Sequence, residues 1–296
     1  MKQLIILIFC IFPLLCWAEG TFPQSEYMFP NERKGIYFLD DNKIKFESQY
    51  DSGYTSKPFV NNYSGSYNIR IDDLFTYLDI MTESGEKYSL VVHWTKDTIV
   101  LTDPDTKEIL IGIGLESTPP ISMMPHLRSF DALSATSFFT ETYGGKTYKY
   151  TPDNLRNEDL TTPWVEGVEG LGIGEKLKFY TYDRTRAIVI ANGYFDPARP
   201  DLYYANNRLK KVLIRTFDEA DGTWRYETPW ELEDTYNLQS LVIPDLWQYF
   251  ELEIVEVYKG DKYDDTCIAG LFTHVGLGMY QGQKQPFVVL PQPIEK

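Results

Sequence analysis

Two acids and three glycines stand close together in residues 161–179, which read TTPWVEGVEGLGIGEKLKF. Glu166 and Glu169 could act as a glycosidase pair, in which one carboxyl group donates a proton and the other attacks or activates water. Such a pair faces across a cleft at roughly 5–10 Å and normally comes from different strands. Here both acids lie in one short loop. We therefore predict that this stretch performs no acid–base catalysis.

The alternating glycines Gly170, Gly172 and Gly174 could instead hold a phosphate group. A glycine loop binds phosphate when the N-terminus of a helix follows it, because the free amide groups then point at the anion. The residues that follow, Glu-Lys-Leu-Lys-Phe, have the alternation of a strand. The glycines are therefore predicted to form a tight loop with positive φ angles.

No other catalytic set is apparent. The three histidines, His93, His126 and His274, are not spaced as metal ligands on a helix, and no Gly-x-Ser-x-Gly motif occurs. Cys267 follows Asp264 and Asp265, whose charges would raise the pKa of its thiol and weaken it as a nucleophile. We predict that Cys267 is a small buried strand residue and that the protein is not an enzyme and has no cofactor.

The composition limits the partners. The net charge is −15, and an acidic chain without a basic run repels nucleic acid and anionic lipid surfaces. The 22 tyrosines contribute to an aromatic content of 15%. This content favours half-buried strand positions, and it also provides surfaces on which sugar rings can stack.

The N-terminus resembles an export signal. Lys2 precedes the apolar run Leu4–Leu15, and Cys16-Trp17-Ala18 offers a cleavage site, so we expect residues 1–18 to be removed and the mature chain to be periplasmic or secreted. The alternative is lipid attachment at Cys16. No later apolar run reaches the roughly 20 residues of a membrane span. With Cys267 alone in the mature chain, no internal disulfide is expected.

The elements that must position any site are short strands. Residues 36–39 and 44–46 flank a turn at 40–43, residues 75–81 and 88–94 flank a turn at 83–86, and residues 99–101 and 109–113 flank a turn at 103–106. The pattern predicts an antiparallel meander or small barrel in an N-terminal domain, residues 19–125. Asp40, Asp41, Asp72 and Asp73 are read as turn and surface acids. Prolines between 119 and 125 predict a linker at its end.

Longer strands follow in a second domain, residues 126–296. Phe250, Leu252 and Ile254 share one face, whereas Val255 and Val257 are out of phase, which predicts a β-bulge near Ile254. Strands at such intervals with long loops are typical of a β-sandwich. The predicted fold class is therefore all-β throughout.

Six motifs in this half carry a resemblance: SATSFF (134–139), YTPDNL (150–155), TTPWVEGVEGLGIGE (161–175), IANGY (190–194), YYANNRLKKVLI (203–214) and VYKGDKYDDTCIAGL (257–271). Their order and spacing over residues 128–291 are similar to those of the discoidin-like module called the NADase-type glycan-binding domain. The resemblance implies a jelly-roll β-sandwich of the galactose-binding-like type. Its loops at one end would hold a carbohydrate, and it would contain no NAD-cleaving centre.

Discoidin-like sandwiches often bind a structural calcium ion between the loop before the tryptophan and a glutamate near the last strand. Asp159 and Thr162 occupy the first position in this chain, but Gly270 stands where the family has the glutamate. We therefore predict no calcium site.

The resemblance and the residue types together give a set of ligand-binding candidates: Trp164, Glu166, Glu175, Tyr194, Tyr204, Asn206, Asn207 and Arg208. Planar acid and amide groups suit paired sugar hydroxyls, and aromatic rings suit sugar faces. Alternatively, Arg208 forms a bidentate pair with Glu166 or Glu175 that only locks two loops together. The predicted function is an exported, non-enzymatic protein that binds a carbohydrate or cell-envelope glycan. The alternative is a structural or protein-interaction component of the bacterial envelope.

Overall fold

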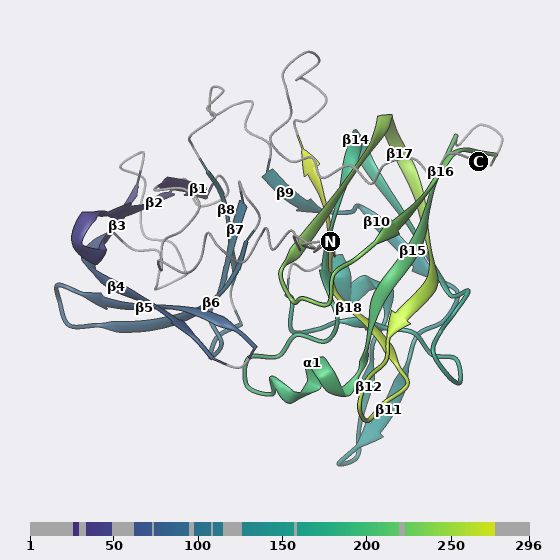
Figure 1. Cartoon of the computed structure of the whole chain (residues 1–296), viewed down its shortest axis with the longest axis horizontal. Coiled ribbons are helices and arrows are strands. Elements are labelled where there is room, and N and C mark those ends of the chain that lie inside the picture. The colour runs from purple at the N-terminus through teal and green to yellow at the C-terminus, as the bar shows by residue number, and fades with distance from the viewer. Residues whose placement is uncertain are drawn as a thin grey trace, which may run out of the picture.

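The computed structural model describes residues 26–29, 34–48, 62–72, 74–94, 98–107, 109–114, 126–156, 159–218 and 223–275. They form two β-domains that lie side by side (Figure 1). The predicted export signal and cleavage site, the proline-rich linker and the last 21 residues lie outside the described parts of the chain. None of the described helices is long and apolar enough to cross a membrane.

The N-terminal domain is a closed eight-stranded antiparallel barrel, so the small barrel is the correct one of the two predicted forms. Each strand pairs with the next along the chain, and β8 returns to β1. All three predicted hairpins are present. The elements are β1 (Glu26–Phe29), β2 (Lys34–Leu39), η1 (Asp40–Asn42), β3 (Lys43–Ser48), β4 (Tyr63–Ile71), β5 (Thr76–Thr82), β6 (Lys87–Trp94), β7 (Thr98–Thr102) and β8 (Ile109–Gly114).

Alternation along these strands fills the barrel. Ile36, Phe46, Leu78, Val92 and Leu101 belong to its apolar core, and none exposes more than 1% of its surface. The residues between them point outward, as the period of two in a strand requires.

The C-terminal domain is built on an eight-stranded sheet that folds over its own core. Its elements are β9 (His126–Ser129), β10 (Ala132–Ala135), β11 (Thr140–Tyr143), β12 (Lys146–Lys149), η4 (Pro152–Arg156), β13 (Trp164–Val165), β14 (Lys176–Asn192), α1 (Asp201–Ala205), β15 (Asn207–Phe217), β16 (Trp224–Glu231), β17 (Leu238–Tyr258) and β18 (Thr266–Val275). The long strand β14 pairs with both β17 and β18, and β15 also pairs with both. This arrangement is the predicted β-sandwich.

The predicted bulge in β17 is confirmed. Val212 of β15 lies opposite Ile254, but Lys211 lies opposite Glu256, so Val255 is the extra residue. At this point the backbone of Ile254 turns to the glycine-rich loop: its N–H donates to the carbonyl of Glu175 (3.0 Å), and its carbonyl accepts from Gly174 (2.8 Å). The bulge therefore anchors the glycine-rich loop that contains Gly170, Gly172 and Gly174.

The two domains share a buried apolar cluster. The barrel contributes Phe75, which directly precedes β5, together with Tyr77 of β5 and Val91 of β6, and the sandwich contributes residues that include Phe195 and Tyr236. The Tyr236 ring packs edge-on against Phe75, with ring centroids 4.9 Å apart. We call this cluster the domain joint.

The Tyr236 hydroxyl enters the backbone of the barrel. It accepts a hydrogen bond from the N–H of Thr76 on β5 (2.7 Å) and donates one to the carbonyl of Val92 on β6 (3.2 Å). The regular pairing of these two strands stops next to this point, at Tyr77 and Val91. A side chain of the sandwich thus satisfies two buried polar groups of the barrel.

We expect Tyr236→Phe to lower the free energy of unfolding by about 1–3 kcal/mol, because it leaves a buried amide and a buried carbonyl without their partner. Urea denaturation measures the change. Tyr143→Phe is the control, because the Tyr143 side chain is 78% exposed. Equal stability of the Tyr236→Phe protein and the natural one would contradict this role.

Candidate functional site

The glycine-rich loop has the predicted backbone. Gly170, Gly172 and Gly174 have φ angles of 100°, 67° and 89°. A Cβ atom on Gly172 would lie 2.7 Å from the carboxyl carbon of Glu166, so this glycine is needed for space as well as for φ. The loop is closed tightly over the Glu166 side chain.

Glu166 is fully buried. Its carboxylate accepts hydrogen bonds from the N–H groups of Val168 (2.8 Å) and Thr266 (3.3 Å). Burial raises the pKa of this carboxyl group, and nearby Asp265 and Glu175 add to the effect, whereas the two N–H groups oppose it. Glu166 therefore ties the loop to the start of β18, and its buried carboxylate offers no exposed surface to a ligand.

Trp164 is also fully buried, and its indole N–H donates to the carbonyl of Ser137 (3.1 Å). Trp164 belongs to the core of the sandwich and exposes no ring face on which a ligand could stack. Glu175 is half-buried and accepts hydrogen bonds from the hydroxyl groups of Thr136 (2.6 Å) and Ser137. Both residues thus hold residues 136–137 in place.

Arg208 pairs with neither Glu166 nor Glu175, so that prediction is wrong. Its guanidinium forms a bidentate pair with Asp234, with Nε to Oδ1 at 3.0 Å and Nη2 to Oδ2 at 2.6 Å. Nη1 donates to the carbonyl of Asn206 (2.9 Å), and the group lies 5.3 Å from the ring centroids of Tyr203 and Tyr204. Arg208 is only 4% exposed, so its role is the loop-locking alternative with a different acid.

The two asparagines beside Arg208 are structural as well. Asn206 donates from its side chain to the carbonyl of Leu202 (2.8 Å) and so ends α1. The Asn207 side chain donates to the carbonyl of Asp264 and accepts from the N–H of Gly260 (2.7 Å). Both side chains are buried, which leaves no surface for a ligand. Tyr204 remains 44% exposed.

Tyr194 is different, because its ring contacts Tyr150, which connects it to side chains of further segments. Tyr150, which follows β12, has its ring centroid 6.4 Å from that of Tyr194, and its hydroxyl donates to Glu141 of β11 (2.7 Å). Asp265, just before β18, is close enough for the Glu141 charge to act on it. We call Glu141, Tyr150, Tyr194 and Asp265 the loop-end cluster. Figure 1 shows α1 and the β11–β12 hairpin at the same end of the sandwich.

The electrostatics of the loop-end cluster are those of a partly desolvated acidic surface. Burial raises the pKa of Asp265, and the charges of Asp264 and Glu141 raise it further. Burial also raises the pKa of Tyr150 and of Tyr194. The hydroxyls therefore stay protonated at neutral pH. The cluster presents hydrogen-bond acceptors, hydroxyl groups and aromatic rings within one small area.

Of the loop-end cluster, only Tyr194 was among the ligand-binding residues predicted from the sequence. Glu141, Tyr150 and Asp265 were not predicted. Tyr150 begins the motif YTPDNL, and Asp265 lies in YDDTC, so both stood in segments singled out by the resemblance. Glu141 carried no local signal, since it lies in a polar hairpin that was not predicted. The other missed partner is Asp234, which lies 26 residues from Arg208.

The residues at the implied calcium position do not fit an ion. A Cβ atom on Gly270 would lie 2.6 Å from a methyl group of Leu160 and 2.7 Å from the ring of Phe272, so no acidic side chain has room there. The Asp159 carboxylate accepts from the N–H (2.9 Å) and hydroxyl (2.7 Å) of Thr161. Within the described residues, no group of three or more His, Cys, Asp or Glu side chains could hold a metal ion. Cys267 is buried, which confirms its predicted place, and burial with Asp265 raises the pKa of its thiol.

Residues 129–273 match the model of the family described as the NAD glycohydrolase translocation F5/8 type C domain. This match covers the C-terminal domain, which we call the F5/8 type C domain below. The F5/8 type C domain is discoidin-like, as the sequence motifs predicted, and includes every residue of the loop-end cluster. No curated protein matches the chain significantly.

Several solved carbohydrate-binding modules resemble the F5/8 type C domain at low identity. The family 32 module of AlyQ in complex with 4,5-unsaturated mannuronic acid is 15% identical, has a TM-score of 0.34, and covers 51% of this chain and 97% of its own. A Clostridium perfringens family 32 module in complex with GalNAc-β-1,3-galactose is 13% identical, with a TM-score of 0.36 and coverages of 48% and 93%. The family 32 module of C. perfringens NanJ in complex with galactose is 14% identical, with a TM-score of 0.34 and coverages of 50% and 98%.

Proposed function

We propose that this protein binds a carbohydrate through the loop-end cluster of its F5/8 type C domain. The observation that carries the proposal is the convergence of Glu141, Tyr150, Tyr194 and Asp265 from four separate segments. Carboxylates accept hydrogen bonds from sugar hydroxyls, and aromatic rings contact the C–H faces of sugars. The cluster combines both kinds of group on loops that a rigid sandwich positions.

The charge of the cluster favours an uncharged sugar. Glu141, Asp264 and Asp265 are all acidic, and the Nζ atom of Lys259 lies 3.6 Å from the Asp264 carboxylate. An anionic sugar would add repulsion to a surface on which burial already disfavours charge. We therefore infer that the ligand is a neutral glycan.

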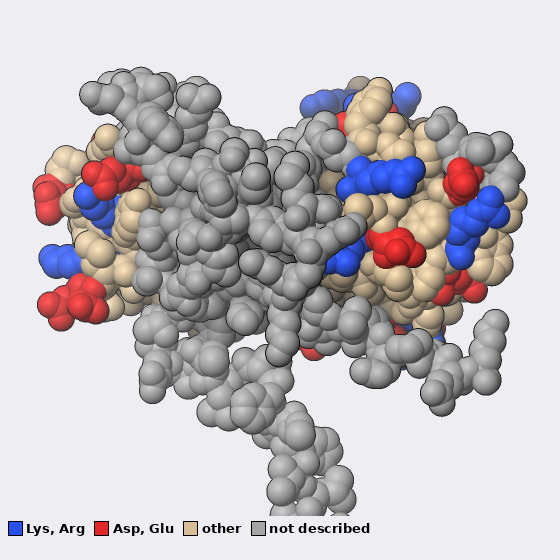
Figure 2. Space-filling model, turned by 90° about the horizontal axis from the view of Figure 1, so that it is seen from above, with Lys and Arg blue, Asp and Glu red and all other residues tan. Residues whose placement is uncertain are grey.

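The setting of this activity is part of the proposal. Residues 1–18 resemble an export signal and support export to the periplasm or out of the cell. The alternative to cleavage after residue 18 is lipid attachment at Cys16, which would anchor the protein to a membrane. A cell-envelope glycan would then be within reach. We propose that the protein has no enzymatic activity of its own, and that the carboxylates of the loop-end cluster act only as hydrogen-bond acceptors for the sugar. Positive and negative side chains are interspersed over the described part of the face in Figure 2, which offers no basic tract for nucleic acid.

A glycan array with the natural protein and two variants tests this function. We expect saturable binding to one class of neutral sugars, and a loss of at least about tenfold in affinity for Asp265→Asn, which removes a charged acceptor. Tyr150→Phe removes the hydroxyl bonded to Glu141 and should also weaken binding. Asp265→Asn should leave stability unchanged or raise it, because the raised pKa means that folding disfavours this charge.

The matched control is Tyr143→Phe, which changes an exposed tyrosine on the same hairpin. Affinity should also fall as the pH is lowered through the raised pKa of Asp265, since a protonated carboxyl group is a poorer acceptor. A folded protein that binds no sugar, or binding that survives both variants, would reject the proposal. That result would favour the alternative role as a protein-interaction component of the envelope.

A further inference from the structure

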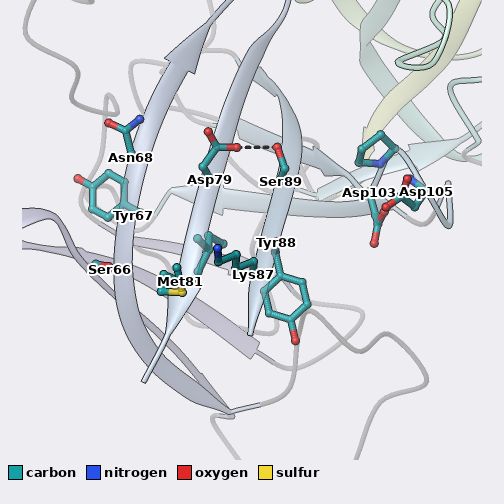
Figure 3. A pocket seen from close by; sticks show the side chains of 12 residues that line it. Ser66, Tyr67, Asn68, Asp79, Met81, Lys87, Tyr88, Ser89, Asp103 and Asp105 are labelled. Carbon is teal, nitrogen blue, oxygen red and sulfur yellow. Dashed lines mark hydrogen bonds between the residues drawn. The ribbon is translucent and has the colours of Figure 1, made fainter. Parts of the chain in front are cut away.

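A second polar site lies on the barrel, away from the F5/8 type C domain. A pocket of about 530 Å³ opens on the outer face of β4, β5 and β6. Cross-strand pairing arranges its outward side chains in two rows. One row is Asn68, Asp79 and Ser89, and the next is Ser66, Met81 and Lys87 (Figure 3).

One side of the pocket is formed by the turn between β7 and β8, which carries Asp103, Pro104 and Asp105. This turn is well defined by hydrogen bonds. The Asp103 carboxylate accepts from the N–H groups of Asp105 (2.8 Å) and Thr106 (3.2 Å), and its carbonyl accepts from Lys107 (2.8 Å). The side wall is thus held by its own backbone.

The carboxylate at the centre of the first row is held in a fixed position. Asp79 accepts hydrogen bonds from Arg70 (2.9 Å from Nε and 3.3 Å from Nη2) and from the Ser89 hydroxyl (2.6 Å). Arg70 lies 4.0 Å from the ring centroid of Tyr77, which belongs to the domain joint. Although burial alone would raise the pKa of Asp79, these hydrogen bonds lower it below its usual value. The acceptor is therefore ionised and preorganised.

The other polar groups of the pocket face solvent. Asn68, Ser66 and Lys87 are exposed and supply an amide, a hydroxyl and an ammonium group. Neighbouring strands are about 5 Å apart, so these groups form an array of donors and acceptors at the scale of one sugar ring. The volume falls within the range of about 300–1,000 Å³ typical of small-molecule sites.

We propose that this pocket is a second binding site, for a neutral mono- or disaccharide. The charges argue for an uncharged ligand, because Arg70 compensates Asp79, while the pocket also contains both the positive Lys87 and the negative Asp103 and Asp105. A phosphate or other anion would meet three acidic residues. An apolar ligand would displace water from the Asn68 amide and the Ser66 hydroxyl without replacing its hydrogen bonds.

This site does not depend on the loop-end cluster, but the two are linked in geometry. The domain joint connects β5 and β6, which form the floor of the pocket, with the sandwich. Two weak sites held at a fixed separation bind a glycan with repeated units more tightly than either site alone, provided that the spacing matches. With a second sugar site, the barrel would contribute to the affinity of the protein for such a glycan.

Protection of Lys87 from acetylation tests the proposal directly. The protein is treated with a limited amount of acetylating reagent, with and without lactose, maltose, cellobiose or chitobiose at about 10 mM, where a Kd of about 1 mM gives about 90% occupancy. We expect at least one sugar to slow the acetylation of Lys87 by about threefold or more, as this occupancy allows. Lys178 on β14 of the sandwich, exposed and outside the pocket, is the internal control and should react at the same rate.

Variants then separate the two sites. Asn68→Ala and Asp79→Asn should abolish the protection of Lys87, and Asp265→Asn in the sandwich should leave it unchanged. If no sugar of the set protects Lys87, or if protection survives Asn68→Ala and Asp79→Asn, the barrel site is rejected, whatever the array shows for the loop-end cluster. Circular dichroism of each variant confirms that a lost signal is not lost folding.

Discussion

Arg208→Ala is expected to lower the free energy of unfolding by about 3 kcal/mol, because removing the buried partner of an ion pair leaves the partly buried carboxylate of Asp234 without its countercharge. Asp234 loses both of its bonds to the guanidinium, and the carbonyl of Asn206 loses its donor. The estimate lies at the lower end for buried pairs, since the Asp234 side chain is 31% exposed. Urea denaturation of the variant and the natural protein measures the difference.

Arg199→Ala provides the comparison. Arg199 also forms a bidentate pair, with Asp201 at 2.9 and 2.8 Å, but both side chains are more than half exposed. Its removal should cost less than about 1 kcal/mol, as surface pairs generally do. Equal effects of the two substitutions would mean that burial adds nothing to the Arg208 pair. Loss of sugar affinity in Arg208→Ala without loss of stability would restore Arg208 to the ligand-binding residues.

The second large effect is a pH dependence carried by His93. This histidine is fully buried in the domain joint, with its ring centroid 4.5 Å from that of Phe195 and 4.9 Å from that of Tyr236. Neither ring nitrogen has a hydrogen-bond partner among the described residues. Burial lowers the pKa of His93 from 6.5 to about 3.

The sign follows from which state binds the proton. Below pH 6.5 the unfolded chain protonates His93, whereas the folded protein keeps it neutral down to about pH 3. Stability from this group is therefore complete above pH 6.5 and falls as the pH decreases towards 3. At about 1.4 kcal/mol per pH unit, the loss between pH 7 and pH 4 is about 3 kcal/mol.

His93→Leu removes this titration and keeps an apolar side chain of similar size. Urea denaturation at pH 7 and at pH 4 gives the decrease in the free energy of unfolding over this range for each protein. We expect this decrease to be about 3 kcal/mol smaller in the variant than in the natural protein. The acidic residues titrate in both proteins, so the difference between the two curves isolates His93. Parallel curves would contradict the neutral, buried histidine.

The strands of both domains could be predicted because their signals are local. Alternation in residues 36–46 and the turn residues around Asp41 define a hairpin without help from the rest of the chain. The bulge at Val255 was predictable for the same reason, since it appears as a shift of the alternation itself. Closure of the barrel needed one further fact, the pairing of β1 with β8.

The candidate site was harder to predict than the strands, because its contacts join segments that are distant in the sequence. The sequence suggested an acid for Arg208 from the glycine-rich loop, but the fold brings Asp234 to it from the loop after β16. Charged residues are rarely buried, so a fully buried Glu166 held only by backbone N–H groups ran against the usual expectation. Glu141 and Asp265 become neighbours only when the β11–β12 hairpin and β18 are in place.

The contact of Tyr236 with β5 and β6 determines whether the two domains can be produced separately or fused to other proteins. The family match begins at residue 129, which suggests a portable module. A fragment cut there would leave Tyr236, Phe195 and Phe272 facing water, and the barrel alone would do the same with Phe75 and Val91. Exposed apolar surface of this kind promotes aggregation. Fusion proteins and domain swaps should therefore carry the barrel and the sandwich together.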